Sequence, residues 1–150
     1  MIILLSILFL LVLYFPSIEY NAIDISPDFT LLIIIIISLK SGQKSATVIG
    51  FLIGFIKDLI TQYSSLGFLS LLTTCFGYST GNLNMIKDRT MKYSLLTILI
   101  FLYFFVEYFL RYSESYFFYF KFSFIRTFST LLVFLILRKT FTIFFKSIEK

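Results

Sequence analysis

The sequence predicts an all-α integral membrane protein in which six transmembrane helices form one compact bundle, a single domain over residues 1–150. Composition is the first reason. The chain is 59% hydrophobic and 14% charged, with a mean hydropathy of +0.95, whereas soluble domains are about 45–50% apolar and about 25% charged. The second reason is the pattern, because long apolar segments alternate with short polar connections.

A helix needs about 20 apolar residues to cross the hydrocarbon core of a bilayer. The six apolar segments cover residues 2–18, 27–39, 45–61, 66–86, 93–111 and 115–137. No basic residue precedes the first segment and no small-residue cleavage site follows it, so we interpret it as a retained span and not as a signal peptide. The second and third segments are short, and a short segment can be a re-entrant or partly buried helix.

Local signals mark where the second segment begins and ends. Pro27 suits the first turn of a helix, because proline lacks an N–H that would have no helical partner there. The polar sequence 41–43, Ser-Gly-Gln, suits a tight turn between the second and third segments.

Basic residues predict the orientation. The connection 19–28 has no lysine or arginine, whereas the connections 40–44 and 87–92 and the tail 138–150 contain most of the basic residues. By the positive-inside rule, both termini lie in the cytoplasm. This topology accounts for the net charge of +5, and no motif indicates nucleic-acid binding. In the tail, Phe141, Phe144, Phe145 and Ile148 share one helix face, which predicts an amphipathic helix on membrane lipid or on a cytoplasmic partner.

Small residues recur along the third and fourth segments. Ala46, Gly50, Gly54 and Asp58 are spaced by four, so they share one helix face. Ser70, Thr73, Gly77 and Gly81 form a similar stripe, and Gly67 ends a turn between the two segments. Stripes of this kind let membrane helices approach closely. We expect a tight antiparallel hairpin of these two helices, or contacts of each stripe with another helix.

Asp58 continues the glycine stripe into an apolar environment, where a carboxylate is costly unless it is paired. Its neighbour Lys57 points about 100° away around the helix, so we expect it to extend toward the interface. At similar depth lie Glu107, Lys121 and Arg126, which predicts an intramembrane ion-pair network with Asp58. The network either holds the bundle in register, shapes a surface read by a partner, or handles ions or protons.

The sequence offers little for catalysis. The single Cys75 cannot form an internal disulfide, and histidine is absent. We find no cofactor or metal motif, and the connections are too short for a soluble active site, so we expect no enzyme activity.

Residues 27–81 resemble the rod-shape-determining MreD family. The shared features are Pro27-Asp28, a glycine-rich helix ending in Asp58-Leu59, Leu66-Gly67, and Gly77-Tyr78 with Gly81. Lys57 stands where that family often has glutamine.

The resemblance implies a non-enzymatic scaffold of the cell-elongation and peptidoglycan-synthesis complex in the bacterial inner membrane. Its expected partners are an MreC-like protein, RodA, the elongation penicillin-binding transpeptidase and MreB. It also implies a six-helix fold similar to the substrate-binding subunits of energy-coupling-factor transporters.

Two other functions remain open. A substrate-binding subunit of a vitamin or metal transporter would use Asp58, Glu107, Lys121 and Arg126 to line a polar pocket. A small membrane enzyme would gather polar residues at the interface, for which the only inner cluster is 87–92.

Overall fold

The computed structural model describes residues 12, 14, 19–20, 23–61, 67–111 and 115–140. Within these ranges two short strands pair as an antiparallel hairpin, β1 (Glu19–Tyr20) and β2 (Ile23–Asp24). Four α-helices follow, with the 3-10 turn η1 (Leu83–Met85) between the second and third of them. The helices are α2 (Phe29–Thr61), α3 (Phe68–Asn82), α4 (Arg89–Arg111) and α5 (Tyr116–Thr140).

The helical fold is compatible with the predicted membrane protein, but six transmembrane helices are not supported. By length and composition alone, three elements in the described part of the chain could cross a membrane: Phe29–Ile60, which contains a bend at Gly42, Arg89–Leu110 and Tyr116–Lys139. The predicted segments 27–39 and 45–61 belong to one element, and α3 has only 15 residues. Most of segment 2–18, and the tail from residue 141 on, lie outside the described residues.

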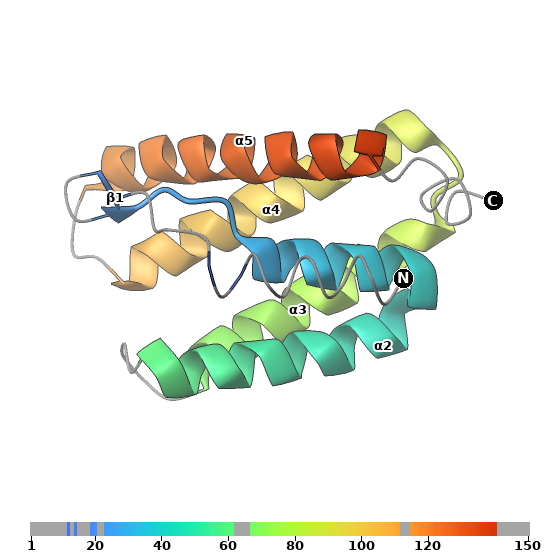
Figure 1. Cartoon of the computed structure of the whole chain (residues 1–150), viewed down its shortest axis with the longest axis horizontal. Coiled ribbons are helices and arrows are strands. Elements are labelled where there is room, and N and C mark those ends of the chain that lie inside the picture. The colour runs from blue at the N-terminus through green and yellow to red at the C-terminus, as the bar shows by residue number, and fades with distance from the viewer. Residues whose placement is uncertain are drawn as a thin grey trace.

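A single glycine folds α2 back on itself. Gly42 has φ 79° and ψ −173°, which are not helical angles, and the two halves of α2 run in opposite directions on either side of it (Figure 1). A positive φ is easily adopted by glycine alone, because it has no Cβ. The bend therefore lies at the turn predicted for 41–43, and the helical residues continue directly on either side of it.

The first half of α2 is the buried centre of the bundle. Leu31, Leu32, Ile34, Ile35 and Ile36 are all fully buried. A helix that is apolar all round belongs in a protein interior. The short second segment is thus a partly buried helix, one of the two forms expected from its length.

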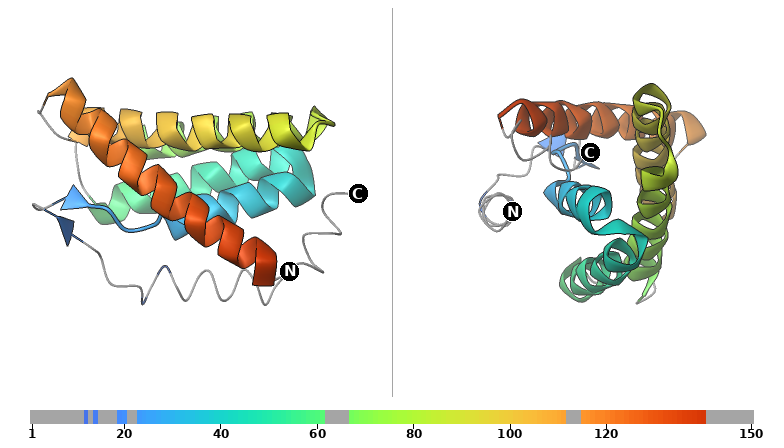
Figure 2. Two further views of the ribbon diagram at one scale, coloured as in Figure 1. Left: turned by 90° about the horizontal axis from the view of Figure 1, so that it is seen from above. Right: turned by 90° about the vertical axis from the view of Figure 1, so that its right-hand side faces the viewer.

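The helices pack as two antiparallel pairs. The second half of α2 lies along α3, and α4 lies along α5 (Figure 1). Figure 2 shows α5 crossing α4 obliquely, with the first half of α2 next to α5 and the second half of α2 at the opposite side of the bundle. The connection between α3 and α4 joins the two pairs at the end of the molecule where α2 bends.

Helix α4 begins earlier than the predicted segment 93–111. Asp88 accepts a hydrogen bond from the backbone N–H of Thr90 at 3.0 Å, and aspartate is one of the residues that cap helix N-termini best. The basic sequence from Arg89 to Lys92 is therefore the first turn of a helix and not a loop.

Candidate functional site

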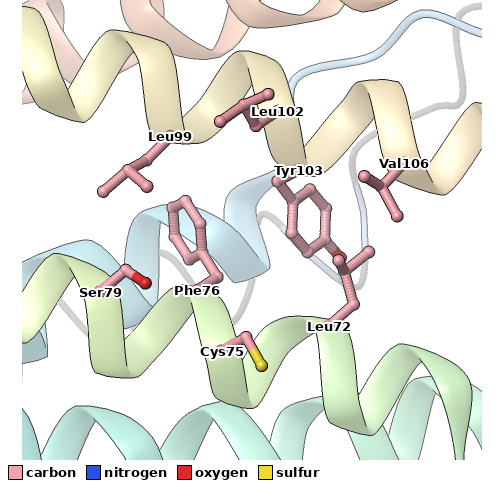
Figure 3. Close-up of a pocket in the computed structure, with 8 residues that line it drawn as sticks. All are labelled: Leu72, Cys75, Phe76, Ser79, Leu99, Leu102, Tyr103 and Val106. Carbon is pink, nitrogen blue, oxygen red and sulfur yellow. The ribbon is translucent and has the colours of Figure 1, made fainter.

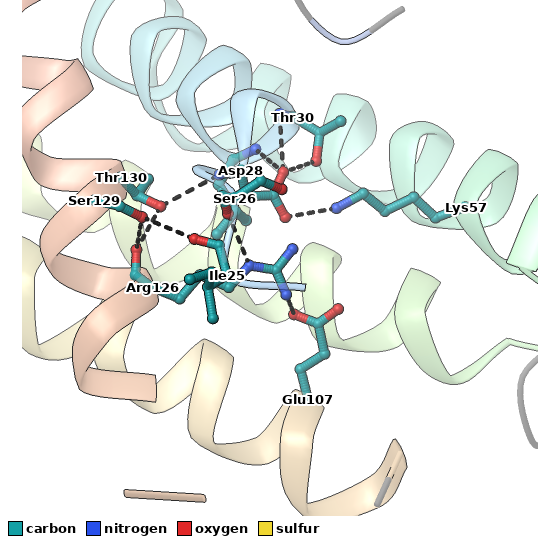
Figure 4. Close-up of polar contacts among 10 residues, drawn as sticks. Ile25, Ser26, Asp28, Thr30, Lys57, Glu107, Arg126, Ser129 and Thr130 are labelled. Carbon is teal, nitrogen blue, oxygen red and sulfur yellow. Dashed lines mark hydrogen bonds and ion pairs between the residues drawn. The ribbon is translucent and has the colours of Figure 1, made fainter. Parts of the chain in front are cut away.

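The most polar part of the described interior surrounds an extended segment, residues 25–28, that enters the bundle before α2. Residues 25–27 of this segment lie outside the helices and strands, and backbone groups inside an apolar bundle need partners. Helix α5 supplies them. Arg126 Nε donates to the Ser26 carbonyl oxygen at 3.2 Å, and Ser129 Oγ donates to the Ile25 carbonyl oxygen at 3.4 Å (Figure 4).

Asp28 ends this extended segment and caps α2. Its backbone N–H donates to Thr130 Oγ1 at 3.3 Å. Its Oδ1 accepts hydrogen bonds from the backbone N–H groups of Thr30 and Leu31, at 2.9 and 3.3 Å. These are the first free donors of the helix, which an N-cap aspartate normally satisfies.

The second carboxylate oxygen of Asp28 forms an ion pair. Lys57 Nζ lies 2.8 Å from Asp28 Oδ2, and the lysine side chain is 20% exposed (Figure 4). Lys57 therefore turns into the bundle, which corrects the expectation that it extends toward the interface. The physical reason is that a paired ammonium and carboxylate avoid the cost of two separate charges in an apolar environment.

Glu107 and Arg126 form a second ion pair near that of Asp28 and Lys57 (Figure 4). These four residues are called the polar cluster below. Their side chains are 2% and 7% exposed, and Arg126 Nη1 lies 3.5 Å from Glu107 Oε2. The guanidinium carbon also lies 4.8 Å from the centre of the Phe104 ring and 5.8 Å from that of Tyr108. Attraction to the aromatic faces adds to the stabilisation of the buried cation.

The structure brings together two of the four residues of the predicted ion-pair network. Glu107 and Arg126 are in contact, whereas Lys121 is exposed, with its Nζ 5.8 Å from the centre of the Phe122 ring. The carboxylate of Asp58 lies at the start of α3. Their places in the cluster are taken by Asp28 and Lys57.

The sequence contained a signal for the Asp28–Lys57 pair that the prediction did not use. Asp28 precedes Gly42 by 14 residues and Lys57 follows it by 15. If the chain folds back at Gly42, two positions at nearly equal distances from the bend lie at nearly the same height. Opposite charges at such positions are candidates for an ion pair.

Asp58 caps α3 from a neighbouring helix. Its two carboxylate oxygens accept hydrogen bonds from the backbone N–H groups of Leu69 and Ser70, at 3.1 and 2.9 Å. The N-cap residue of α3 is Gly67, which has no side chain and a φ of 99°. The acid that ends the glycine stripe of α2 therefore replaces the missing cap of α3.

The two glycine stripes meet each other. A Cβ added at Gly50 or Gly54 would lie closer than 3.0 Å to Thr73, and one added at Gly77 or Gly81 would lie that close to Ala46 or Gln43. Real Cβ atoms do not approach so closely, so these four glycines are what allows the backbones of α2 and α3 to touch. This is the hairpin contact expected from the stripes, and Gly67 lies in the turn before α3, where the sequence placed it.

The polar cluster and the Asp58 cap hold helices and the extended segment together. The carboxylates of Asp28, Asp58 and Glu107 each accept hydrogen bonds from, or form an ion pair with, other groups in the bundle. In the described ranges no three histidine, cysteine, aspartate or glutamate residues gather as a metal site would require.

Replacing Asp58 with alanine is expected to lower the free energy of unfolding by about 2–3 kcal/mol, because two backbone donors lose a charged acceptor inside the protein. Asp88→Ala is the matched control. Asp88 is exposed, and it caps α4, so its loss is expected to cost about 1 kcal/mol. Unfolding by denaturant in detergent micelles measures both, and amide exchange at Leu69 and Ser70 locates the effect. Equal losses for the two variants would contradict the buried cap.

Comparisons of the chain with protein-family models, with curated proteins and with solved structures found no match.

Proposed function

We propose that this protein is an MreD-like scaffold of the cell-elongation complex in the bacterial inner membrane, with both termini in the cytoplasm. It acts through contacts between helices, above all with the single transmembrane helix of an MreC-like protein. Contacts with RodA, the elongation transpeptidase and MreB complete the proposed assembly.

One observation carries the proposal: five described residues on which the resemblance to the MreD family rests, Asp28, Gly50, Gly54, Asp58 and Gly67, belong to one structural unit. Asp28 caps α2, and Asp58 caps α3. Gly50 and Gly54 let the two helices touch, and Gly67 forms the turn that begins α3. Such a motif preserves the shape of a helical unit, and a protein that presents surfaces to partners needs that property.

The outward surface also favours a scaffold. On α5 the exposed side chains are mainly aromatic and aliphatic, and they include Phe117, Phe120, Phe124 and Phe128. The second half of α2 exposes Phe51, Phe55 and Ile56. In a bilayer these faces contact lipid or other transmembrane helices, so they are the available binding surfaces for a membrane partner.

The ends of the bundle fit the proposed orientation. Lys87, which precedes α4, and Arg89 and Lys92 in its first turn lie at the same end as Arg138, because the guanidinium carbon of Arg138 lies 4.8 Å from the centre of the Tyr93 ring. A basic end of this kind is expected on the cytoplasmic side.

The test is photocrosslinking to an MreC-like partner produced with this protein. A photoreactive residue replaces Phe124 on α5 or Ile56 on α2, both exposed, and buried Phe104 serves as the control position. We expect crosslinks from at least one exposed position and none from position 104, together with co-purification of the partner. Absence of both crosslinks and co-purification, with tight binding of a small molecule by the purified protein, would favour a transporter subunit instead.

A further inference from the structure

A surface feature distinct from the buried polar cluster lies in the contact between α3 and α4. It is a groove with a volume of about 140 Å³ whose lining is almost wholly apolar (Figure 3). Its lining includes Leu72, Cys75, Phe76, Leu99, Tyr103 and Val106. Cys75 and Leu102 on its rim are exposed, so the groove opens onto the outer surface of the bundle.

The groove follows the direction of an acyl chain. On α4, the lining residues Leu99 and Val106 are separated by seven residues, so they lie on one stripe along the helix axis. A groove parallel to transmembrane helices is also parallel to the lipid chains around them. A lipid acyl chain is therefore the expected occupant of the groove. Any preference for one lipid over another depends on the protein groups that contact its headgroup.

The headgroup end of the same stripe carries a fixed positive charge. Lys92 precedes Leu99 by seven residues, which places it on the same face of α4 about 10 Å nearer the basic end. Its Nζ donates to Asn84 Oδ1 at 3.1 Å, and the Asn84 side-chain amide donates to the Ser38 carbonyl oxygen at 2.6 Å. These bonds hold the ammonium over the connection between α3 and α4, with Arg89 one turn away.

We propose that the groove binds an anionic phospholipid, with one acyl chain along α3 and α4 and the headgroup phosphate at Lys92 and Arg89. The apolar lining selects the chain, and the two cations select the anionic headgroup. This inference rests on the proposed membrane location but not on the scaffold role, because lipid binding needs no protein partner.

The protein has no tryptophan, so a single introduced tryptophan is a clean reporter. Leu102→Trp places it at the rim of the groove, and Ile56→Trp places it on the exposed face of α2. The two positions are at matched depth, since Leu102 is 13 residues from the start of α4 and Ile56 is 14 residues from the Gly42 bend. Each variant is reconstituted without partners into phosphatidylcholine vesicles that contain a small fraction of brominated phosphatidylglycerol or brominated phosphatidylcholine.

Brominated phosphatidylglycerol is expected to quench Leu102→Trp more strongly than brominated phosphatidylcholine at the same fraction, whereas Ile56→Trp shows no preference. Adding Lys92→Gln to Leu102→Trp is expected to lower the relative affinity for the anionic lipid about fivefold. Equal quenching of Leu102→Trp by the two lipids would overturn the proposal. So would a tryptophan shielded from both lipids, which would mean that the groove is filled by protein.

Discussion

Replacing Arg126 with methionine is expected to lower the free energy of unfolding by about 3–5 kcal/mol, the usual cost of removing one partner from a buried ion pair. Methionine fills much of the same volume, so the loss reports charge and hydrogen bonding more than packing. Glu107 would keep a buried carboxylate without its guanidinium partner, and the Ser26 carbonyl oxygen would lose its Nε donor. For a chain of this length the melting temperature falls by about 2–4 °C for each kcal/mol.

Lys121→Met on the same helix is the matched control. Lys121 is exposed, so the same change there is expected to alter stability by less than about 1 kcal/mol. The double variant Arg126→Met/Glu107→Met is expected to recover part of the loss, because it leaves no unpaired charge in the interior. Thermal unfolding in one detergent measures all three variants. A single Arg126→Met variant as stable as the native protein would show that the cluster does not hold the extended segment.

The features of the fold that the sequence predicted were local ones. Gly42 lies in a polar interruption between two apolar runs, and its bend needs only a residue that tolerates positive φ. The glycine spacing along α2 and α3 was informative for a similar reason. A regular stripe of small residues along a membrane helix mainly allows another helix to approach closely.

The number of spans and the polar partners were harder to predict, because both depend on tertiary structure. Hydropathy measures how long and how apolar a segment is, but not whether protein or lipid covers it. The all-apolar run at the start of α2 is therefore ambiguous until its neighbours are known. The extended segment before it is ambiguous too, because its hydrogen-bond partners, Arg126 and Ser129, are about 100 positions away in sequence.

Charge pairing shows the same limit at the level of single residues. The prediction grouped Asp58, Glu107, Lys121 and Arg126 by depth alone. Residues at one depth meet only if they also face each other around their helices. Arg126 and Glu107 satisfy both conditions, whereas Lys121 is exposed on α5.

Replacing Gly54 with leucine is expected to separate α2 from α3 and to abolish association with an MreC-like partner. The clash begins at the Cβ, which would lie closer than 3.0 Å to Ser70 Cα and to the Leu69 carbonyl oxygen. Backbone atoms cannot rotate away as a side chain can, so the helices themselves must move. Overpacking costs about 1–3 kcal/mol where neighbours can adjust, and we expect a loss at or above the upper end here.

The separation would also remove the cap of α3. Asp58 lies one turn beyond Gly54 on the same face, and its hydrogen bonds to Leu69 and Ser70 require the close approach. Exchange protection at those two amides is therefore expected to fall in Gly54→Leu. Exchange protection should fall less in Gly54→Ala, because alanine introduces the clashing Cβ but none of the additional side-chain atoms of leucine.

Val48→Leu is the matched control for added bulk on α2, because Val48 is 59% exposed. We expect this variant to retain native stability and to co-purify with the partner. The decisive comparison is partner capture by the native protein, Gly54→Ala, Gly54→Leu and Val48→Leu at equal expression. If Gly54→Leu captured as much partner as Val48→Leu, the contact between α2 and α3 would have no part in the proposed assembly.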